Sequence, residues 1–190
     1  MEGAYAIKTG KLVSLSEEQL INCVNGGQFD CNTGGDMVEA FKNVIKNKVI
    51  VSEESNPYKT KDHQKCTYKS GVGNYAATFT GFKTVKTNDE DALKTAVASQ
   101  PVSIAIDASQ QSFQFYSTGV YSDSKCCTNC SSDQLDHGVL AVGYGTLQGK
   151  DYWLIKNSWA SGWGDKGFIM IARNAKGMCG VPTMASFPIA

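Results

Sequence analysis

The spacing of apolar residues changes along the 190-residue chain, and this change limits the fold more than any other feature of the sequence. Before residue 100, apolar residues recur at the spacing of amphipathic helices. After residue 100, short β-branched and apolar runs are separated by glycine-rich turns, as is typical of strands. Helices and strands are therefore expected in separate parts of the chain, with the changeover near residues 70–100. This segregation predicts an α+β fold.

The expected elements have recognisable ends. Residues 1–8 resemble the end of a helix that Thr9 and Gly10 terminate. A second helix is expected after Ser16, a good N-cap with Gln19 three residues later. Residues 36–48 place apolar side chains on one helical face, and residues 88–91 begin a short helix. Strands are expected at residues 101–107, 138–143, 152–156 and 167–172.

Charge and hydropathy exclude two classes of protein. The chain has 18 Lys+Arg and 18 Asp+Glu without a long basic run, so nothing indicates nucleic-acid binding. No apolar stretch is long enough to cross a bilayer. Residues 1–10 also lack the apolar run and the cleavage site of a signal peptide.

Seven cysteines are a high number for a cytosolic protein of this size and indicate an oxidising compartment. Some of them could instead be buried thiols. Cys127 and Cys130 have the C-x-x-C spacing of zinc ligands, but no second C-x-x-C or H-x-x-x-H pair completes a site, so no metal is expected. The odd number leaves at least one sulfur without an intrachain partner.

The two histidines stand in different surroundings. His63 lies in a polar segment and is expected to be a solvated loop residue. His137 opens an apolar strand. Asn157, twenty residues later, stands at the end of the next expected strand. An amide in that place can hold an imidazole in one tautomer, and Trp159 can shield the bond from water. The alternative is that Asn157 is a turn residue and that the tryptophans belong to the core.

The segments around these residues resemble the histidine and asparagine segments of papain and the cathepsins. The resemblance rests on residues 135–145 (LDHGVLAVGYG), 151–159 (DYWLIKNSW), 162–164 (GWG) and 167–168, with residues 12–23, 178–180 and 187–188. These motifs occur in the family's order from Glu2 to Pro188, nearly the whole chain. The chain therefore resembles a papain-family cysteine protease of the cathepsin L-like kind.

The resemblance implies one peptidase domain with the papain-like, two-lobed fold. Residues 1 to about 78 would form the helical left lobe and residues 79–190 the β-rich right lobe, with a substrate cleft between them. The implied activity is endopeptidase cleavage through an acyl-enzyme, without a cofactor. His137 would be the base, Asn157 its orienting residue and Trp159 the shield.

The family's nucleophile lies in a C-G-S-C-W type signature at the start of the central helix, and the 190 residues do not contain it. Glu2 matches a point roughly nine residues past that cysteine. The chain is therefore expected to be truncated before Met1, without the propeptide, the nucleophile or the oxyanion-hole glutamine, and to be inactive alone. The alternative is a non-catalytic papain-like homologue that binds peptides or inhibitors.

The resemblance also implies a pattern of cysteine pairing. The implied bridges are Cys23–Cys66 and Cys130–Cys179, and the implied free thiol is Cys31, whose partner lies beside the missing nucleophile. Cys126 and Cys127 have no counterpart in the family, and a bridge between adjacent residues is strained. Neither they nor Cys130 are expected to replace the nucleophile, because they lie in a loop rather than at a helix start.

The substrate-binding residues implied by the resemblance are Gly34, Gly35, Met37, Ala105, Leu135, Asp136 and Met184. Gly34 and Gly35 stand in a C-N-T-G-G segment that is one residue longer than the family's C-x-G-G motif. The main specificity pocket is apolar, so a bulky aliphatic or aromatic residue is expected two places before the cut, and arginine is expected to be disfavoured. The alternative is that Met37 and Met184 are core residues.

The implied partners are protein or peptide substrates and cystatin-like inhibitors, and the intact parent is expected to be a monomer. Neither nucleic acid nor a membrane is expected to bind. By family resemblance, the expected location of the intact parent is the lysosome or the extracellular space.

Overall fold

In the computed structural model, the chain divides into two compact units, which we describe separately. Unit 1 comprises Met1–Lys83 with Pro188–Ala190, and unit 2 comprises Thr84–Phe187. The structure describes all residues except 27–31, 49, 60–65 and 67–74. The predictions for Cys31 and His63 therefore lie outside the described residues. The boundary expected near residue 78 between two lobes of one domain stays a prediction.

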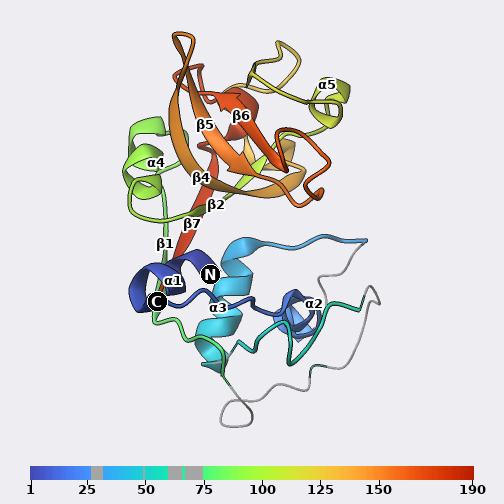
Figure 1. Ribbon diagram of the computed structural model, residues 1–190, viewed down its shortest axis with the longest axis vertical. Coiled ribbons are helices and arrows are strands. Elements are labelled where there is room, and N and C mark those ends of the chain that lie inside the picture. Colours follow the sequence, from blue (N-terminus) through green and yellow to red (C-terminus); the bar gives the residue numbers. More distant parts are fainter. Residues whose placement is uncertain (27–31, 49, 60–65, 67–74) are drawn as a thin grey trace. The chain divides into compact units, whose positions relative to one another are not determined.

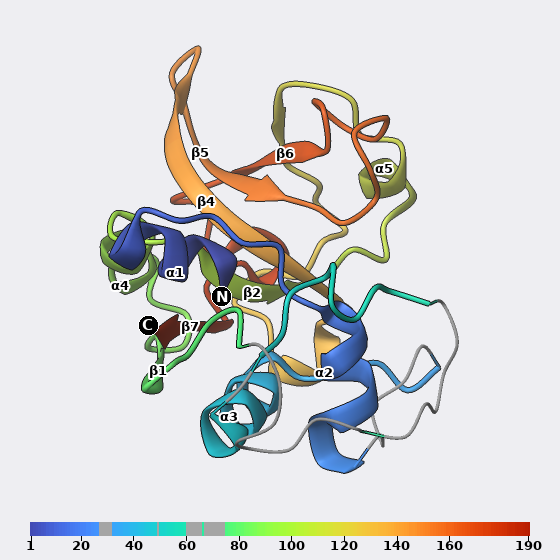
Figure 2. The ribbon, with the colours of Figure 1, turned by 60° about the horizontal axis from the view of Figure 1, so that its bottom comes forward.

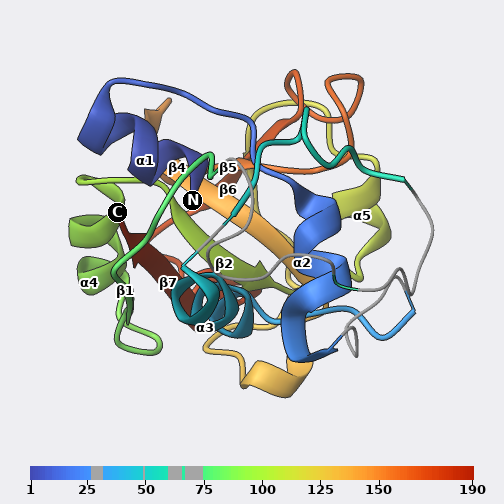
Figure 3. The ribbon, with the colours of Figure 1, turned by 90° about the horizontal axis from the view of Figure 1, so that it is seen from below.

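The described residues of unit 1 form three α-helices and a short 3-10 helix. Their bounds are α1 Glu2–Thr9, α2 Glu17–Cys23, η1 Val24–Gly26 and α3 Met37–Asn47. The expected ends of α1 and α2 are present: Gly10 has a left-handed φ of 73°, and the Ser16 hydroxyl accepts a hydrogen bond from the Gln19 N–H at 3.0 Å. The Asp36 carboxylate caps α3 in the same way. Figures 1 and 3 show α2 and α3 running in clearly different directions.

The core of unit 1 is small and is supported by buried polar groups. Its apolar residues include Leu15, Val44 and Ile50. The Gln19 side chain accepts a hydrogen bond from the Val51 N–H at 2.8 Å, and the Glu18 carboxylate accepts from the Lys59 N–H at 3.0 Å. Both donors belong to residues 51–59, so buried hydrogen bonds hold this segment against α2.

A seven-stranded sheet, most of which lies in unit 2, has the strand order β1-β7-β2-β4-β5-β6-β3. The strands are β1 Gly81–Thr84, β2 Val102–Ile106, β3 Val120–Tyr121, β4 His137–Leu147, β5 Lys150–Lys156, β6 Phe168–Ala172 and β7 Met184–Ile189. The central pairs are antiparallel, whereas β3 pairs with β6 in parallel. Figures 1 and 2 show β4 and β5 as a long, twisted hairpin.

The helices of unit 2 are short. Their bounds are α4 Glu90–Val97, α5 Gln111–Gln114, η2 Ser132–Gln134 and η3 Met178–Gly180. The Asp89 carboxylate caps α4 by accepting the Ala92 N–H at 2.9 Å, as the acidic run at residues 88–91 predicts. The core between these helices and the sheet contains Phe113 and Trp153, neither of which is exposed. Figures 1 and 2 show α5 well away from α4.

One carboxylate joins several segments of unit 2. Glu90 accepts hydrogen bonds from the Trp153 indole N–H at 3.2 Å, the Asn174 N–H at 2.8 Å and the Gly177 N–H at 3.1 Å. The first turn of α4 is thereby attached to β5 and to the loop that follows β6. In the described part of the chain, no helix has the length and apolar character needed to span a bilayer.

Candidate active site

His137 is held at the first position of β4. It is paired with Ile106 at the end of β2. The residue before it, Asp136, donates its N–H to the Ile106 carbonyl at 3.0 Å and accepts the Ala108 N–H on its carboxylate at 2.8 Å. The imidazole therefore projects from a strand end that is fixed on both sides, and a main-chain contact occupies the Asp136 carboxylate.

Asn157 is the hydrogen-bond partner of this imidazole. The Oδ1 atom of Asn157 lies 2.7 Å from Nε2 of His137. Asn157 follows β5 directly, is 7% exposed, and donates its own N–H to the Gly167 carbonyl at 3.0 Å. Because β4 and β5 are neighbouring antiparallel strands, the start of β4 lies beside the end of β5, and residues twenty positions apart meet there.

A second hydrogen bond fixes the direction of this contact. The Ser158 N–H donates to the same Oδ1 atom at 2.8 Å. An amide oxygen only accepts, so this bond sets which end of the Asn157 amide faces the ring, and Nε2 of His137 must be the donor. The neutral ring then has its lone pair on Nδ1, which is free to take up a proton.

Aromatic rings cover the histidine–asparagine pair. The Trp159 ring centroid lies 5.0 Å from that of His137, with the planes 34° apart. The buried ring of Phe113 lies edge-on to both, with centroids 5.7 Å from Trp159 and 6.5 Å from His137. Trp163 packs 5.3 Å from Phe113 and donates its indole N–H to the Gln114 carbonyl at 2.9 Å. Apolar surface on this side keeps water from the Nε2–Oδ1 bond.

The structure places four of the expected substrate-binding residues in unit 2. Ala105 on β2 is paired with Met184 on β7 and with Gly138 on β4. Leu135 packs against Gly180 so closely that a Cβ atom there would overlap the Leu135 Cδ2 atom. Asp136 is exposed beside His137. Of the other three expected residues, Gly34 and Gly35 precede α3 in unit 1, and Met37 is the first residue of that helix.

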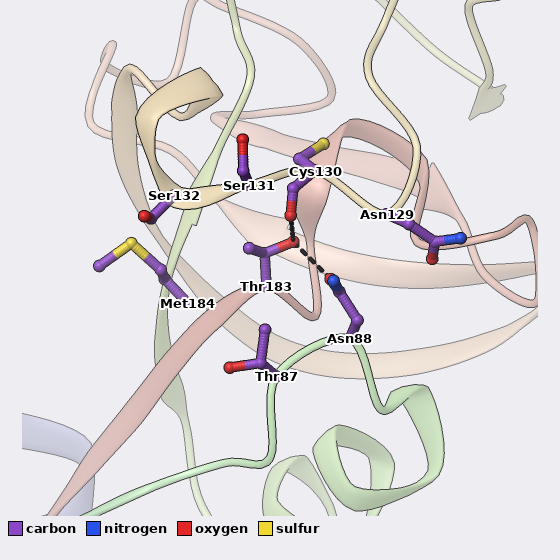
Figure 4. Close-up of a pocket in the computed structure, with 8 residues that line it drawn as sticks. All are labelled: Thr87, Asn88, Asn129, Cys130, Ser131, Ser132, Thr183 and Met184. Atoms are coloured by element: carbon purple, nitrogen blue, oxygen red, sulfur yellow. Dashed lines mark hydrogen bonds between the residues drawn. The ribbon is translucent and has the colours of Figure 1, made fainter.

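A cavity of about 360 Å³ lies beside Met184 in unit 2 (Figure 4). Its lining is Thr87, Asn88, Asn129, Cys130, Ser131, Ser132, Thr183 and Met184. The Thr183 hydroxyl donates to the Asn88 amide oxygen at 2.7 Å and lies 3.3 Å from the Cys130 carbonyl oxygen. This lining is neutral, and Met184 is its one member among the substrate-binding residues expected from the sequence.

The cysteine pairing differs in part from the expected pattern. Cys23 is bridged to Cys66, as expected. The expected Cys130–Cys179 bridge is wrong: Cys179 is bridged to Cys126, and Cys130 is bridged to Cys127. The cause is local, because the buried side chain of Cys126 reaches Cys179 and a four-residue turn brings Cys127 and Cys130 together.

Two contributors to the site were not predicted. Phe113 supports the shield, but it stands alone in the polar run QQSFQ, where no periodicity distinguishes it. The Ser158 N–H fixes the Asn157 amide, and main-chain donors leave no signal in a sequence. In the described part of the chain, no group of three or more His, Cys, Asp or Glu residues is placed to hold a metal ion.

Comparison with known proteins gives the family. A family model described as "Papain family cysteine protease" matches residues 1–189. Cysteine proteinase 3 of Dictyostelium discoideum is 49% identical over 191 residues, covering 100% of this chain and 55% of the relative. Cathepsin S of Mus musculus is 50% identical over 192 residues, covering 99% and 54%. The chain thus spans about half the length of these curated relatives.

Solved structures agree with this assignment. Bromelain from Ananas comosus, solved with the inhibitor E64, has a TM-score of 0.86 and 37% identity, over 98% of this chain and 83% of that one. Procathepsin L 3 of the Tenebrio molitor larval midgut has a TM-score of 0.88 and 40% identity, over 100% and 60%. The papain-like α+β fold is therefore confirmed. The chain belongs to the papain family of cysteine proteases, in its cathepsin L-like part.

Proposed function

We propose that this chain carries the base and the orienting amide of a cysteine-type endopeptidase, which cleaves peptides by Cys–His–Asn acyl transfer. The 2.7 Å contact between Nε2 of His137 and Oδ1 of Asn157 is the main support. With Nε2 committed to Asn157, Nδ1 is the atom that exchanges a proton with a thiol. The Asn157 oxygen also stabilises the imidazolium that this exchange creates.

The chemistry follows from that protonation. A cysteine thiol transfers its proton to Nδ1 of His137, and the resulting thiolate attacks the scissile carbonyl. The imidazolium then protonates the leaving amine, and water hydrolyses the acyl-enzyme with His137 as the base. Trp159 and Phe113 limit access of bulk water to the Asn157 side of the ring throughout.

We also propose that residues 1–190 do not hydrolyse peptides by themselves. Six of the seven cysteines are in disulfides, so none of those six can supply a thiolate. The family's nucleophile signature does not occur in the sequence. Loss of a triad nucleophile lowers turnover about 10⁶-fold in a serine protease analogue. The seventh, Cys31, stands in the C-N-T-G-G segment and not in that signature, so activity is proposed to require a cysteine from residues beyond these 190.

Two proteins test both proposals: residues 1–190 alone, and the same chain preceded by a segment that carries the oxyanion-hole glutamine and the C-G-S-C-W signature. The measurements are fluorogenic peptide hydrolysis and covalent labelling by E64, the inhibitor bound in the bromelain structure. Activity and labelling are expected only in the extended protein, with hydrolysis lost in His137→Ala. Hydrolysis by residues 1–190 would contradict their inactivity, and peptide binding without cleavage by the extended protein would support the non-catalytic alternative.

We propose that the extended enzyme prefers a bulky aliphatic or aromatic residue two places before the cut. The support is the apolar character of Ala105 and Met184, which are paired across β2 and β7, and of Leu135 nearby. Cystatin-like inhibitors are proposed to bind at the same site, and the enzyme is proposed to act as a monomer. Three disulfides support an oxidising location, the lysosome or the extracellular space.

A further inference from the structure

The loop before η2 contains three cysteines within five residues, and the proposed proteolytic function uses none of them. Cys126 is bridged to Cys179, and Cys127 is bridged to Cys130. The Cys127–Cys130 bridge closes a C-x-x-C turn in which Asn129 has a left-handed φ of 47°. C-x-x-C is the arrangement in which reactive cysteines occur in disulfide exchange proteins, so this turn can carry chemistry of its own.

The four sulfur-bearing residues form one cluster. A Cβ atom on Gly180, the residue after Cys179, would lie 3.0 Å from the Cys130 sulfur. The Cys179 N–H donates to the Cys127 carbonyl at 2.9 Å. Figure 4 shows the Cys130 carbonyl oxygen directed at Thr183 and its sulfur pointing the other way. Cys130 therefore lies beside the Cys126–Cys179 bridge without being part of it.

Access to the two bridges is unequal. Cys126, Cys130 and Cys179 are 4%, 2% and 0% exposed, whereas Cys127 is partly exposed. A thiol in solution can thus reach the Cys127 sulfur, and the electron pair then leaves on Cys130. The Asp107 carboxylate favours the same outcome, because it accepts the Cys127 N–H at 3.0 Å and its negative charge disfavours a thiolate on Cys127.

We propose that the Cys127–Cys130 bridge is a thiol-exchange site, and that its opening allows Cys130 to replace Cys126 as the partner of Cys179. The proposal is independent of the proteolytic function. One thiol of a dithiol reductant attacks the Cys127 sulfur, forms a mixed disulfide with it and releases Cys130 as a thiolate. The second thiol of the reductant then attacks that mixed disulfide, so the reductant leaves as a cyclic disulfide and Cys127 is freed as a thiol. The Cys130 thiolate attacks the Cys179 sulfur and releases Cys126.

The two steps balance. The first transfers two electrons from the dithiol to the Cys127–Cys130 bridge, and the second exchanges one disulfide for another with no net electron transfer. The closed Cys127–Cys130 bridge leaves Cys126 as the one partner in this loop for Cys179. Opening the bridge makes Cys126 and Cys130 competitors for the same sulfur. Cys130 lies directly before the segment that leads through η2 to His137, so exchange moves the attachment point of that segment.

A matched pair of variants tests the exchange. Cys127→Ser leaves Cys130 free to compete, whereas Cys130→Ser leaves only Cys127 free. Each is made in an oxidising secretory host, quenched with acid and alkylated after denaturation, and tandem mass spectrometry locates the label. In Cys127→Ser we expect label on Cys126 in more than about a tenth of molecules, because isomers within about 1.4 kcal/mol of each other coexist at that level. In Cys130→Ser we expect label on Cys127 alone in this loop.

The outcomes decide the proposal. Label only on Cys130 in Cys127→Ser would overturn the exchange. Label on Cys126 in Cys130→Ser would show that Cys126 can be displaced from Cys179 without Cys130. The unmodified protein gives a second measurement that needs no variant to fold. With one equivalent of dithiothreitol, label is expected first on Cys127 and Cys130 and then on Cys127 and Cys126, with opening at least about tenfold faster than at Cys126–Cys179. Earlier label on Cys179 would overturn the assignment of the exchange site.

Discussion

The side chain of Phe113 lies edge-on to the indole of Trp159, with ring centroids 5.7 Å apart and planes at 86°. Trp159 in turn lies against His137, and Phe113 itself is fully buried. A residue of the short helix α5 therefore supports the ring that covers the proposed catalytic imidazole. The stability of unit 2 and the cover over His137 are coupled through this one side chain.

Replacing Phe113 with alanine is expected to lower the free energy of unfolding by about 3–5 kcal/mol, because the change leaves a cavity among Trp159, Trp163 and Tyr121. Chemical denaturation measures this loss. Phe115, two residues later and 75% exposed, is the matched control, and Phe115→Ala is expected to change stability by no more than about 0.5 kcal/mol. Equal effects at the two positions would contradict the assignment of Phe113 to the core.

Asn157→Ala in the extended, nucleophile-bearing enzyme is expected to reduce kcat/KM roughly 10- to 150-fold. The estimate converts about 1.5–3 kcal/mol for a hydrogen bond to a charged group at 1.36 kcal/mol per factor of ten. The lost bond is the one to Nε2 of His137. Asn174→Ala removes an exposed amide that bonds Asp151, and it is expected to leave kcat/KM unchanged. A drop of similar size in both variants would point to a general loss of structure.

Glu90→Ala is expected to destabilise unit 2 by about 2–3 kcal/mol, because three N–H donors lose the carboxylate that they share. The neighbouring Asp91→Ala is the control and is expected to cost less than about 1 kcal/mol, the contribution of an exposed acid to the helix dipole. Thermal unfolding followed by circular dichroism compares the two. A smaller loss for Glu90 than for Asp91 would show that the carboxylate does not hold these segments together.

The contribution of Glu17 to the stability of unit 1 is expected to fall as the pH rises above 4.5. Glu17 lies on the exposed side of α2, and partial desolvation there raises its pKa above its ordinary value of 4.5; its own backbone N–H opposes this, and the Glu53 and Glu2 carboxylates add to it. The folded state thus holds the proton more tightly than the unfolded state. This contribution is fully present below pH 4.5 and is lost as the pH rises through the folded-state pKa.

Glu17→Gln is expected to flatten this dependence, since glutamine is neutral at every pH. The melting temperature of the variant minus that of the parent, measured from pH 4 to pH 7, should rise with pH. Glu54 is exposed as well but is not among the carboxylates that act on Glu17, so Glu54→Gln supplies the control, for which the difference is expected to stay level. A level difference for Glu17→Gln as well would remove the basis of the prediction.

Met184→Glu in the extended enzyme is expected to shift the preferred residue two places before the cut from bulky apolar side chains towards arginine. Met184 is paired with Ala105, so the new carboxylate would stand beside the proposed pocket, where a guanidinium can pair with it. A fluorogenic peptide panel measures kcat/KM for Phe, Leu and Arg at that position. Met184→Gln, similar in size but uncharged, is the control and should not favour arginine.

Patterns that depend on neighbouring residues in sequence were predictable. Ser16 with Gln19, and Gly10 after α1, mark helix ends because caps bond donors only a few residues away. The strands at residues 102–106 and 150–156 have the apolar runs that buried strands require. Strand β3 has two residues and β7 contains Pro188, and neither gives a periodic signal.

Contacts between segments that are distant in sequence were harder to predict. The sequence suggested that Asn157 serves His137, but the family resemblance, not the spacing, raised that above the turn-residue alternative. Which sulfur reaches Cys179 depends on how the loop at residues 126–130 folds, and three cysteines so close together offer several choices that a sequence does not rank. The bonds of Glu90 to Trp153 and Gly177 join residues 63 and 87 positions apart, and no local pattern encodes them.

The last residues of the chain return to the first unit. Strand β7 begins in unit 2, but Pro188–Ala190 belong to unit 1, where the Ile189 carbonyl accepts the Thr80 N–H at 2.8 Å. A protein emerging from the ribosome presents its N-terminal residues first. Unit 1 nevertheless cannot be completed until residues 188–190 have been made, whereas all of unit 2 is synthesised before them. During biosynthesis the unit begun first is therefore the second to be completed, and its contact between Thr80 and Ile189 joins residues made 109 positions apart.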